Sequence, residues 1–405
     1  MKTKVQFLPT IYRNLLITFL FGLTVLTGCQ SGKSLQPTAA SFSQYPDGGG
    51  LYVSAAFGPD GRLWRVVPEQ QFIYVDSSSD FGKTFSHPIR INSESRKIKA
   101  SAEGRPRIAV DRDGRVYVAY TAQTTLPNSV FVSISDQHGQ NFSTPFEISE
   151  SAAAASSYEP QLALSPQNRV YLFWHDERDR ADYRIPGNSI YYAQLDPNAG
   201  RTPNYRAVES QMECECCRIA VDFAEDGTPL VLTRFIYGEN TRDHGLIRID
   251  PRSHHGKSRR VTFDDWEIEA CPEHGPALSL SPEGKLHMVW FTLGNQHRGL
   301  FYANSENQGL EFSNPTPIGN PANLPGHADV ITQDEHVALA WEEFDGNSHR
   351  ILLSQSKDFG TTWSPAQVIA KSASEADYPF LLSDGRTLYL SWNTQAEGYR
   401  LLPLD

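Results

Sequence analysis

Short apolar segments alternate with turn residues along the chain from about residue 51 to its end. Each copy of the pattern has an apolar strand, a turn of the Asp-Gly type, and a second apolar strand that ends in an aromatic residue. The clearest copies are 107–120, 161–174 and 277–290. Apolar and polar positions that alternate on both sides of such turns are typical of β-hairpins. The pattern therefore predicts an all-β chain built from hairpins.

The hairpin recurs often enough to define a repeat. Weaker copies begin near Leu51, Cys217, His327 and Tyr378. The seven units start near residues 51, 105, 159, 217, 276, 327 and 378. A period of roughly 50 to 60 residues is typical of propellers or solenoids. Because four short strands fit each unit, we predict a β-propeller of seven four-stranded blades, with six blades as the alternative.

The last unit is shorter than the others. Its strands are expected at 379–382, 388–392 and 399–402, after which the chain ends without an outer strand. A ring left open would expose sheet edges, which proteins avoid. We therefore expect residues 41–45 to add the missing strand and close the ring. In the six-bladed alternative, the extra hairpin packs elsewhere.

The N-terminal residues have the form of a targeting segment. Lys2, Lys4 and Arg13 precede an apolar run at 15–26, which is too short for a stable membrane span. The Leu-Thr-Gly-Cys run that ends at Cys29 resembles a bacterial lipobox. The alternatives are an uncleaved anchor or an ordinary signal peptide.

The lipobox resemblance implies cleavage before Cys29 and attachment of lipid to its sulfur. Gln30 suggests sorting to the outer membrane. The predicted organisation is a lipoprotein signal peptide at 1–28, a lipidated tether and closing strand at 29–50, and the propeller at 51–405. We expect a protein of the cell envelope that faces the periplasm or the exterior and meets the membrane through its lipid alone.

Composition narrows the class of partner. The 405 residues carry a formal net charge of −11, with 39% hydrophobic, 11% aromatic and 20% charged residues. These values fit a folded domain and argue against disorder. No basic stripe is visible, so we do not expect a nucleic-acid partner.

A second motif, S-x-D-x-G-x-T-[FW], follows the third predicted strand of several units. It is intact at 78–85 and 356–363 and degraded at 135–142 and 305–312. In the intact copies the carboxylate ties its own turn and the glycine takes positive φ; these residues are Asp80, Gly82, Asp358 and Gly360. The motif resembles the Asp box, or BNR repeat, of sialidase-like propellers. The resemblance implies that fold, and fold alone does not fix function.

Strand order locates the face on which a site is expected. Successive strands of a blade are antiparallel, so the loop before the first strand and the loop after the second share one rim, here called the leading rim. Asp boxes, after the third strand, lie on the opposite rim. Many reactive side chains fall in leading-rim loops: Arg105, Arg107, Glu159, Arg218, Glu273, His274, His327, Asp329, Asp377, Tyr378, His175, Asp176, Arg178, Arg234, Tyr237, His244, His297, Arg298, Glu342 and Glu343.

Four cysteines are expected together on this rim. C-x-C-C at Cys214, Cys216 and Cys217 leads into one unit, and Cys271-Pro-Glu-His274 leads into the next. In an oxidising compartment they would form two disulfides, with three possible pairings. Alternatively, the thiolates with His274 or His327 would bind copper or zinc. C-x-C-C with C-P-x-H-G-P is similar to a pattern of bacterial sialidase-like envelope proteins.

The sequence leaves the function between two classes. One is a lipid-anchored propeller whose Cys-, His- and Arg-rich face binds a glycan, an envelope protein or a metal ion. The other is an exo-sialidase acting on sialic acid or a related acidic sugar, which uses an arginine clamp, a Tyr–Glu nucleophile pair and an aspartic acid. Its candidates are Arg107, Arg178, Arg218 and Arg234 for the clamp, Tyr237 or Tyr378 with Glu159 for the pair, and Asp176 or Asp377 for the acid.

Overall fold

The computed structural model describes residues 50–123, 127–149, 155–180, 187–198, 202–209 and 212–404. The predicted closing strand at 41–45 and the predicted lipidation site Cys29 lie outside these residues. Within them, no helix is long and apolar enough to cross a membrane. The only helix there is one 3₁₀ turn, η1 (Pro321–Asn323).

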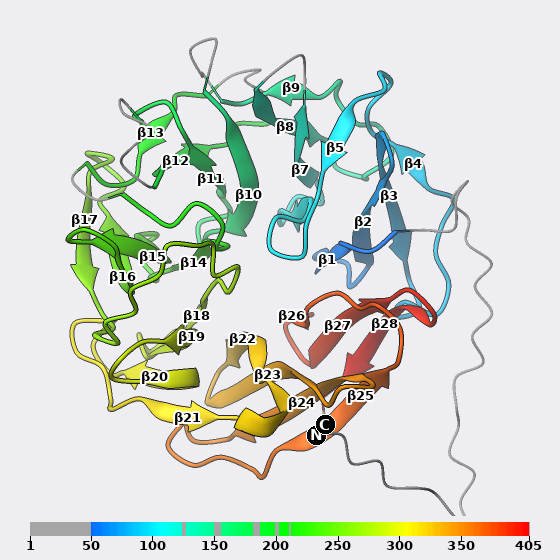
Figure 1. Ribbon diagram of the computed structural model, residues 1–405. Helices are drawn as coiled ribbons and strands as arrows, with labels where there is room; N and C mark the ends of the chain where they lie inside the picture. Colours follow the sequence, from blue (N-terminus) through cyan, green and yellow to red (C-terminus); the bar gives the residue numbers. More distant parts are fainter. Residues whose placement is uncertain are drawn as a thin grey trace, which may run out of the picture. The chain divides into compact units, whose positions relative to one another are not determined.

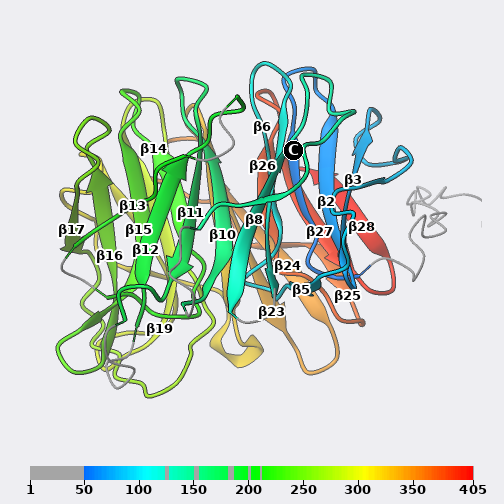
Figure 2. The ribbon, with the colours of Figure 1, turned by 90° about the horizontal axis from the view of Figure 1, so that it is seen from above.

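Seven antiparallel sheets surround a common axis and form a seven-bladed propeller (Figure 1). Figure 2 shows the blades side on. Blade 1 consists of β1 (Ser54–Phe57), β2 (Leu63–Glu69), β3 (Phe72–Ser78) and β4 (Ile89–Arg90). Blade 2 consists of β5 (Lys97–Lys99), β6 (Arg107–Val110), β7 (Val116–Gln123), β8 (Asn128–Ile134) and β9 (Phe146–Glu147). Blade 3 consists of β10 (Ser157–Leu164), β11 (Val170–Asp176), β12 (Ser189–Gln194) and β13 (Tyr205–Arg206).

Blades 4 to 7 continue the same order. Blade 4 consists of β14 (Ala220–Phe223), β15 (Pro229–Tyr237), β16 (Thr241–Ile249) and β17 (Gly256–Arg260), and blade 5 of β18 (Ala277–Leu280), β19 (Leu286–Leu293), β20 (Arg298–Ser305) and β21 (Thr316–Ile318). Blade 6 consists of β22 (Gly326–Gln333), β23 (His336–Phe344), β24 (His349–Ser356) and β25 (Gln367–Ser372). Blade 7 has three strands, β26 (Phe380–Ser383), β27 (Leu388–Thr394) and β28 (Gly398–Pro403). The seven-bladed prediction is confirmed, and each inner strand begins within a few residues of a predicted repeat start.

The predicted hairpins form because their turns are stabilised locally. In blade 2, the Asp111 carboxylate accepts the backbone N–H groups of Asp113 and Arg115, both at 2.9 Å. Gly114 closes this turn with φ of 82°, a backbone conformation that favours glycine. Blade 2 also has a strand that the repeat did not predict: β5 pairs with the second half of β7, while β6 pairs with the first half.

Apolar side chains fill the space between neighbouring blades. Six buried clusters join blades 1 to 2, 2 to 3, 3 to 4, 4 to 5, 5 to 6 and 6 to 7. Blades 7 and 1 meet through aromatic rings, with the Phe57 and Tyr389 centroids 5.2 Å apart. The Asp377 carboxylate also accepts the N–H groups of Tyr52 and Val53, at 2.6 and 3.0 Å. The described part of the chain thus brings the last blade against the first without the predicted closing strand.

The Asp boxes fold as turns after the third strand of their blades. In blade 1, the Asp80 carboxylate accepts the N–H and hydroxyl of Thr84 at 2.8 and 2.6 Å, and these bonds hold the pKa of Asp80 down to about 2. Asp358 in blade 6 repeats both contacts with Thr362. In the degraded copy of blade 2, Asp136 supplies the carboxylate instead of the residue after it.

Candidate functional site at the leading rim

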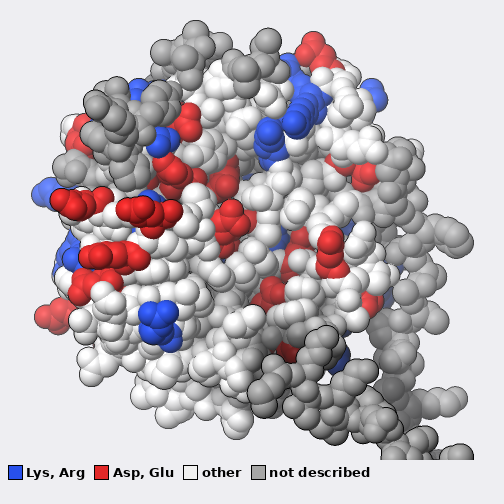
Figure 3. Space-filling view, viewed as in Figure 1, with Lys and Arg blue, Asp and Glu red and all other residues white. Residues whose placement is uncertain are grey.

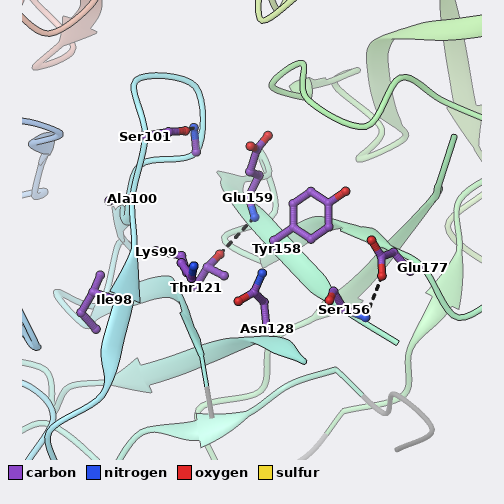
Figure 4. Close-up of a pocket in the computed structure, with 11 residues that line it drawn as sticks. Ile98, Lys99, Ala100, Ser101, Thr121, Asn128, Ser156, Tyr158, Glu159 and Glu177 are labelled. Atoms are coloured by element: carbon purple, nitrogen blue, oxygen red, sulfur yellow. Dashed lines mark hydrogen bonds between the residues drawn. The ribbon is translucent and has the colours of Figure 1, made fainter. Parts of the chain in front are cut away.

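A pocket of about 460 Å³ opens between blades 2 and 3 (Figure 4). Strand β5 forms one wall, and the start of β10 forms another. The wall residues include two carboxylates, one cation, one phenol ring and several small polar side chains. They are Ile98, Lys99, Ala100, Ser101, Gly104, Thr121, Asn128, Ser156, Tyr158, Glu159 and Glu177.

Glu159 reaches this pocket from a β-bulge in the innermost strand of blade 3. The register between β10 and β11 shifts between Tyr158 and Gln161, and Glu159 has φ of 52°. A residue before proline ordinarily adopts extended backbone, so this conformation is strained. The Thr121 hydroxyl accepts the Glu159 N–H at 3.1 Å, as Figure 4 shows. The bulge thus aims a carboxyl group that a regular strand would direct elsewhere.

The Glu159 carboxyl group is buried with an unused hydrogen-bonding atom. Its Oε2 has no hydrogen-bond partner among the described residues and lies 3.5 Å from Nε2 of His175. Burial raises the pKa of Glu159 to about 7, although the charge of His175 opposes this shift. A carboxyl group with this pKa exchanges its proton near neutral pH.

His175 is held behind Glu159 by two contacts. Its Nδ1 lies 2.7 Å from Oε1 of Glu213, and its ring stacks on Tyr158 with centroids 5.6 Å apart. The Glu213 Oε2 accepts the Thr233 hydroxyl at 3.1 Å. Burial disfavours the charged imidazole, but Glu213 and Glu159 together raise the pKa of His175 to about 9. An imidazolium therefore lies between two carboxyl groups.

A second buried cluster, the hub, consists of Glu103, Arg105, Arg107, Arg218 and His327. One Glu103 oxygen accepts the backbone N–H groups of Arg218 and Gly275, both at 3.0 Å, and the other lies 3.5 Å from Nδ1 of His327. Burial alone would raise the pKa of Glu103, but the His327 hydrogen bond and the charge of Arg218 hold it at about 2. Glu103 is therefore an ionised structural carboxylate.

The three hub arginines surround the ring of Phe380, with their Cζ atoms 4.5, 4.9 and 5.1 Å from its centroid. Arg105 donates to the carbonyls of residues 53, 102 and 378. Arg218 donates to those of residues 276 and 328. Of the three hub arginines, only Arg107 has a buried Nε without a partner among the described residues. Burial and the charges of the other two hub guanidinium groups lower the pKa of Arg107 to about 9.

Four rings form a continuous stack beside the hub. His274 lies between Phe291 and His327, with centroid distances of 4.1 and 4.2 Å, and His327 stacks on Tyr378 at 3.4 Å. His327 occupies a β-bulge and has φ of 48°, like Glu159. The sequence placed His274 with the cysteines, but its ring belongs to this stack. Burial raises the pKa of Tyr378, and the neighbouring carboxylate of Glu103 raises it further.

Three of the four cysteines converge as the sequence predicted, and Cys271 lies outside their group. Cys214, Cys216 and Cys217 have sulfur atoms within 4.8 Å of one another. The fourth, Cys271, is exposed, and the net effect on its thiol is a raised pKa, because partial burial outweighs a hydrogen bond with Cys216 that lowers it. No disulfide joins these four cysteines in the structure.

Three of the remaining candidates from the sequence, Arg178, Arg234 and Tyr237, have structural partners, whereas both ring nitrogens of His244 are buried without a partner among the described residues. Arg178 binds both oxygens of Asp176, at 2.9 and 2.7 Å, and Asp176 also accepts the indole N–H of Trp174. Arg234, where other blades have an aromatic residue, donates to the carbonyls of residues 242, 274 and 291. Tyr237 lies under the guanidinium of Arg260. The structure does not gather these residues around Glu159.

Two buried carboxylates of the site were not among the sequence candidates. Glu103 stands two residues before Arg105, and Glu213 directly precedes Cys214. Neither has a local motif that distinguishes it from a solvated loop residue. The one feature of the sequence that could have pointed to them is their position next to candidate residues, Glu103 before Arg105 and Arg107 and Glu213 before Cys214.

Comparisons with known proteins identify the fold. No family model matches the chain, and no curated protein matches it. Among solved structures, a PL25 ulvan lyase is similar over 86% of this chain and 91% of its own, with 11% identity and a TM-score of 0.58. Polysaccharide lyase Uly1 is similar over 93% and 94%, at 10% identity and 0.55. The Hadza microbial sialidase Hz136 is similar over 86% and 74%, at 12% and 0.50. The chain therefore has a sialidase-like propeller fold.

Proposed function

We propose that the protein binds a saccharide in the pocket between blades 2 and 3 and that Glu159 exchanges a proton with it. The observation that carries this proposal is the Glu159 carboxyl group in the wall of a 460 Å³ pocket, with His175 Nε2 3.5 Å behind its Oε2. General acid–base groups work best with a pKa near the working pH, and the pKa of about 7 for Glu159 meets that condition.

The other wall residues suit a sugar. Ser101, Thr121 and Asn128 offer hydroxyl and amide groups to sugar hydroxyls, and Tyr158 offers a ring. Lys99 supplies a positive charge, which an acidic sugar would require. In Figure 3, basic side chains gather over the region of β5, and acidic ones gather towards the centre of the same face. The solved neighbours named above are glycan-acting enzymes, and their likeness supports this class of ligand.

A sialidase-like exo-glycosidase is the second candidate. Three guanidinium groups around Phe380 favour it, because arginines recognise a sugar carboxylate. All three are bonded to backbone carbonyls, Arg107 to that of Glu103 at 3.3 Å, and of the three only Arg107 keeps a buried Nε without a partner among the described residues. This arrangement supports sialidase chemistry less well than the pocket supports saccharide binding.

The proposal includes a lipid anchor at Cys29 that holds the propeller at the cell envelope. The Cys29→Ala change should release the protein from membranes or leave the precursor unprocessed. Retention of the processed protein in the membrane fraction would contradict the anchor while leaving the pocket untested by that result.

The test of the pocket is a binding and turnover screen with the full chain. The panel contains ulvan, other uronate polysaccharides, neutral oligosaccharides and a fluorogenic sialoside. Glu159→Gln should retain binding and lose about 10²- to 10⁴-fold in turnover, the usual contribution of an acid–base group. Glu306→Gln, an exposed change after β20, is the matched control and should be silent. Turnover that Glu159→Gln leaves intact would refute the role of Glu159, and absence of any glycan binding would refute the pocket.

A further inference from the structure

The sulfur atoms at the start of blade 4 have spacings that suit one metal ion. The Cys214 Sγ lies 3.8 Å from Cys216 Sγ and 3.7 Å from Cys217 Sγ. Zinc binds thiolates at about 2.3 Å in a tetrahedron, which places two sulfur ligands about 3.8 Å apart. A single ion therefore fits between these sulfurs with little movement of the chain.

A buried cation accompanies the sulfurs. Arg242 donates through Nη1 to Cys214 Sγ at 3.2 Å and through Nε to Asn240 Oδ1 at 2.9 Å, and its side chain is buried. A buried guanidinium requires an anionic or strongly polar partner. A thiolate meets this need, whereas a disulfide sulfur carries no charge. The positive side chain therefore favours a metal thiolate cluster over a pair of disulfides at this position.

We propose that Cys214, Cys216 and Cys217 bind one thiophilic metal ion, Zn²⁺ or Cu⁺. Cys271, which contacts Cys216 but lies outside the group of three sulfurs, is the fourth ligand once its exposed loop moves towards the ion. Each thiol gives up its proton to water as its bond to the metal forms. His274 is not a ligand in this proposal, because its ring nitrogens are not among the ligand atoms that gather with the three sulfurs.

Such an ion would fix a loop that also supports the pocket. Glu213, which contacts His175, directly precedes Cys214, and the Cys214 N–H bonds to the carbonyl of Arg234 at 2.8 Å. The metal would thus join the loops leading into blades 4 and 5 and keep Glu213 in place. The metal proposal does not depend on the saccharide, since it rests on the sulfur geometry and Arg242.

Metal content is the direct test. The full chain is purified in detergent under nitrogen without chelators, and metals are measured by elemental analysis. We expect one Zn or Cu per chain and X-ray absorption with three or four sulfur neighbours at about 2.3 Å. Zn²⁺ and Cu⁺ added separately to metal-free protein, in competition with chromogenic chelators, decide which of the two ions the site prefers.

Variants separate the ligands from their surroundings. Cys214→Ser and Cys217→Ser should lose the metal, and Cys271→Ser, an exposed change, should weaken retention without unfolding the chain. Glu273→Gln and His274→Asn are controls in the same loop and should keep it. Circular dichroism verifies that each variant is folded. Full metal retention in Cys271→Ser, with three sulfur neighbours in its absorption spectrum, would remove Cys271 from the ligand set.

The alternative predicted from the sequence gives an opposite result. If the four cysteines form two disulfides, the denatured protein will show no free thiols at these positions and no bound metal, which overturns the proposal. Metal retained by every cysteine variant would overturn it too. Neither readout involves a glycan, so failure of the metal site and failure of the pocket are distinguishable.

Discussion

Glu103 and Glu159 are the same side chain in two buried places on one rim, and they have opposite acidities. Glu103 accepts two backbone N–H groups and lies beside His327 and three arginines, so its pKa falls to about 2. Glu159 lies in a pocket wall, where burial and the charges of Glu103 and Glu213 outweigh the charge of His175, so its pKa rises to about 7. Burial by itself acts to raise the pKa of both carboxyl groups, so it does not explain the difference between them. The number of hydrogen bonds and positive charges around each group decides whether it is a structural anion or a proton carrier.

The backbone around the two carboxyl groups also differs, since one glutamate lies in a loop and the other in a strand. Glu103 precedes its blade in a loop whose neighbours come from residues 218, 275 and 327. Glu159 sits inside its strand, at a bulge with positive φ. Strain of this kind is found at functional sites, where it directs a side chain that sheet geometry would not. The hub therefore carries stability, and the bulge serves the proposed chemistry.

The largest effect in this comparison is expected for Glu103→Ala. Its loss would leave the N–H groups of Arg218 and Gly275 unbonded and the hub arginines without their anion. Removal of one partner from a buried charge cluster costs about 3–5 kcal/mol of unfolding free energy. Urea denaturation monitored by tryptophan fluorescence measures this. A loss below about 1 kcal/mol, the size of an exposed ion pair, would show that the hub is not a stabilising centre.

The pH dependence of stability should differ in sign between the two groups. Between pH 4.5 and about 7, the folded chain keeps the Glu159 proton that the unfolded chain has lost, so stability falls as pH rises through this window. Between pH 4.5 and about 2, Glu103 is protonated in the unfolded chain but still ionised in the folded chain, so stability falls as pH drops. Each shift corresponds to about 3 kcal/mol at full extent.

Glu159→Gln isolates the first of these effects. A neutral amide needs no desolvated charge, so the variant should be more stable than the original chain at pH 8 by up to about 3 kcal/mol. The advantage should vanish at pH 4. Thermal unfolding at both pH values provides the measurement. Equal gains at the two pH values would mean that packing, and not ionisation, explains the difference.

A smaller effect is expected for His175→Asn. His175 is a positioning residue whose charge lowers the pKa of Glu159. Without that charge, the pH–rate limb assigned to Glu159 should move to higher pH. The profile of turnover against pH, measured with any substrate the screen identifies, is the readout. A uniform loss of rate with an unmoved limb would assign His175 a purely structural role.

The smallest effect should come from the opposite rim. Asp80→Ala removes the hydrogen bonds to Thr84 in an exposed turn, so the melting temperature should fall slightly. Turnover and metal content should not change, because the Asp boxes and the leading rim lie at opposite ends of the strands. Loss of activity in a folded Asp80→Ala protein would contradict this separation of the two rims.

The fold was predictable because its signals are local. Hairpin turns such as 111–115 and the boxes at Asp80 and Asp358 are specified by residues a few positions apart. Seven repeats of such units leave a propeller as the natural way to bury both faces of every blade. The extra strand β5 escaped because three residues, Lys97–Lys99, carry too little pattern to distinguish a strand from a loop.

The sequence by itself therefore determined the blades, the face on which the reactive side chains gather and the meeting of Cys214, Cys216 and Cys217. Only the tertiary structure decided what those side chains do there. It bonded Arg105 and Arg218 to carbonyls of other blades, stacked His274 between Phe291 and His327, and left one oxygen of Glu159 unbonded. Hydrogen bonding and pKa depend on groups far apart in the chain and on the water excluded around them. Strand periodicity depends on residues close together in the chain, so the strands can be predicted from the sequence, whereas these hydrogen bonds and pKa values cannot.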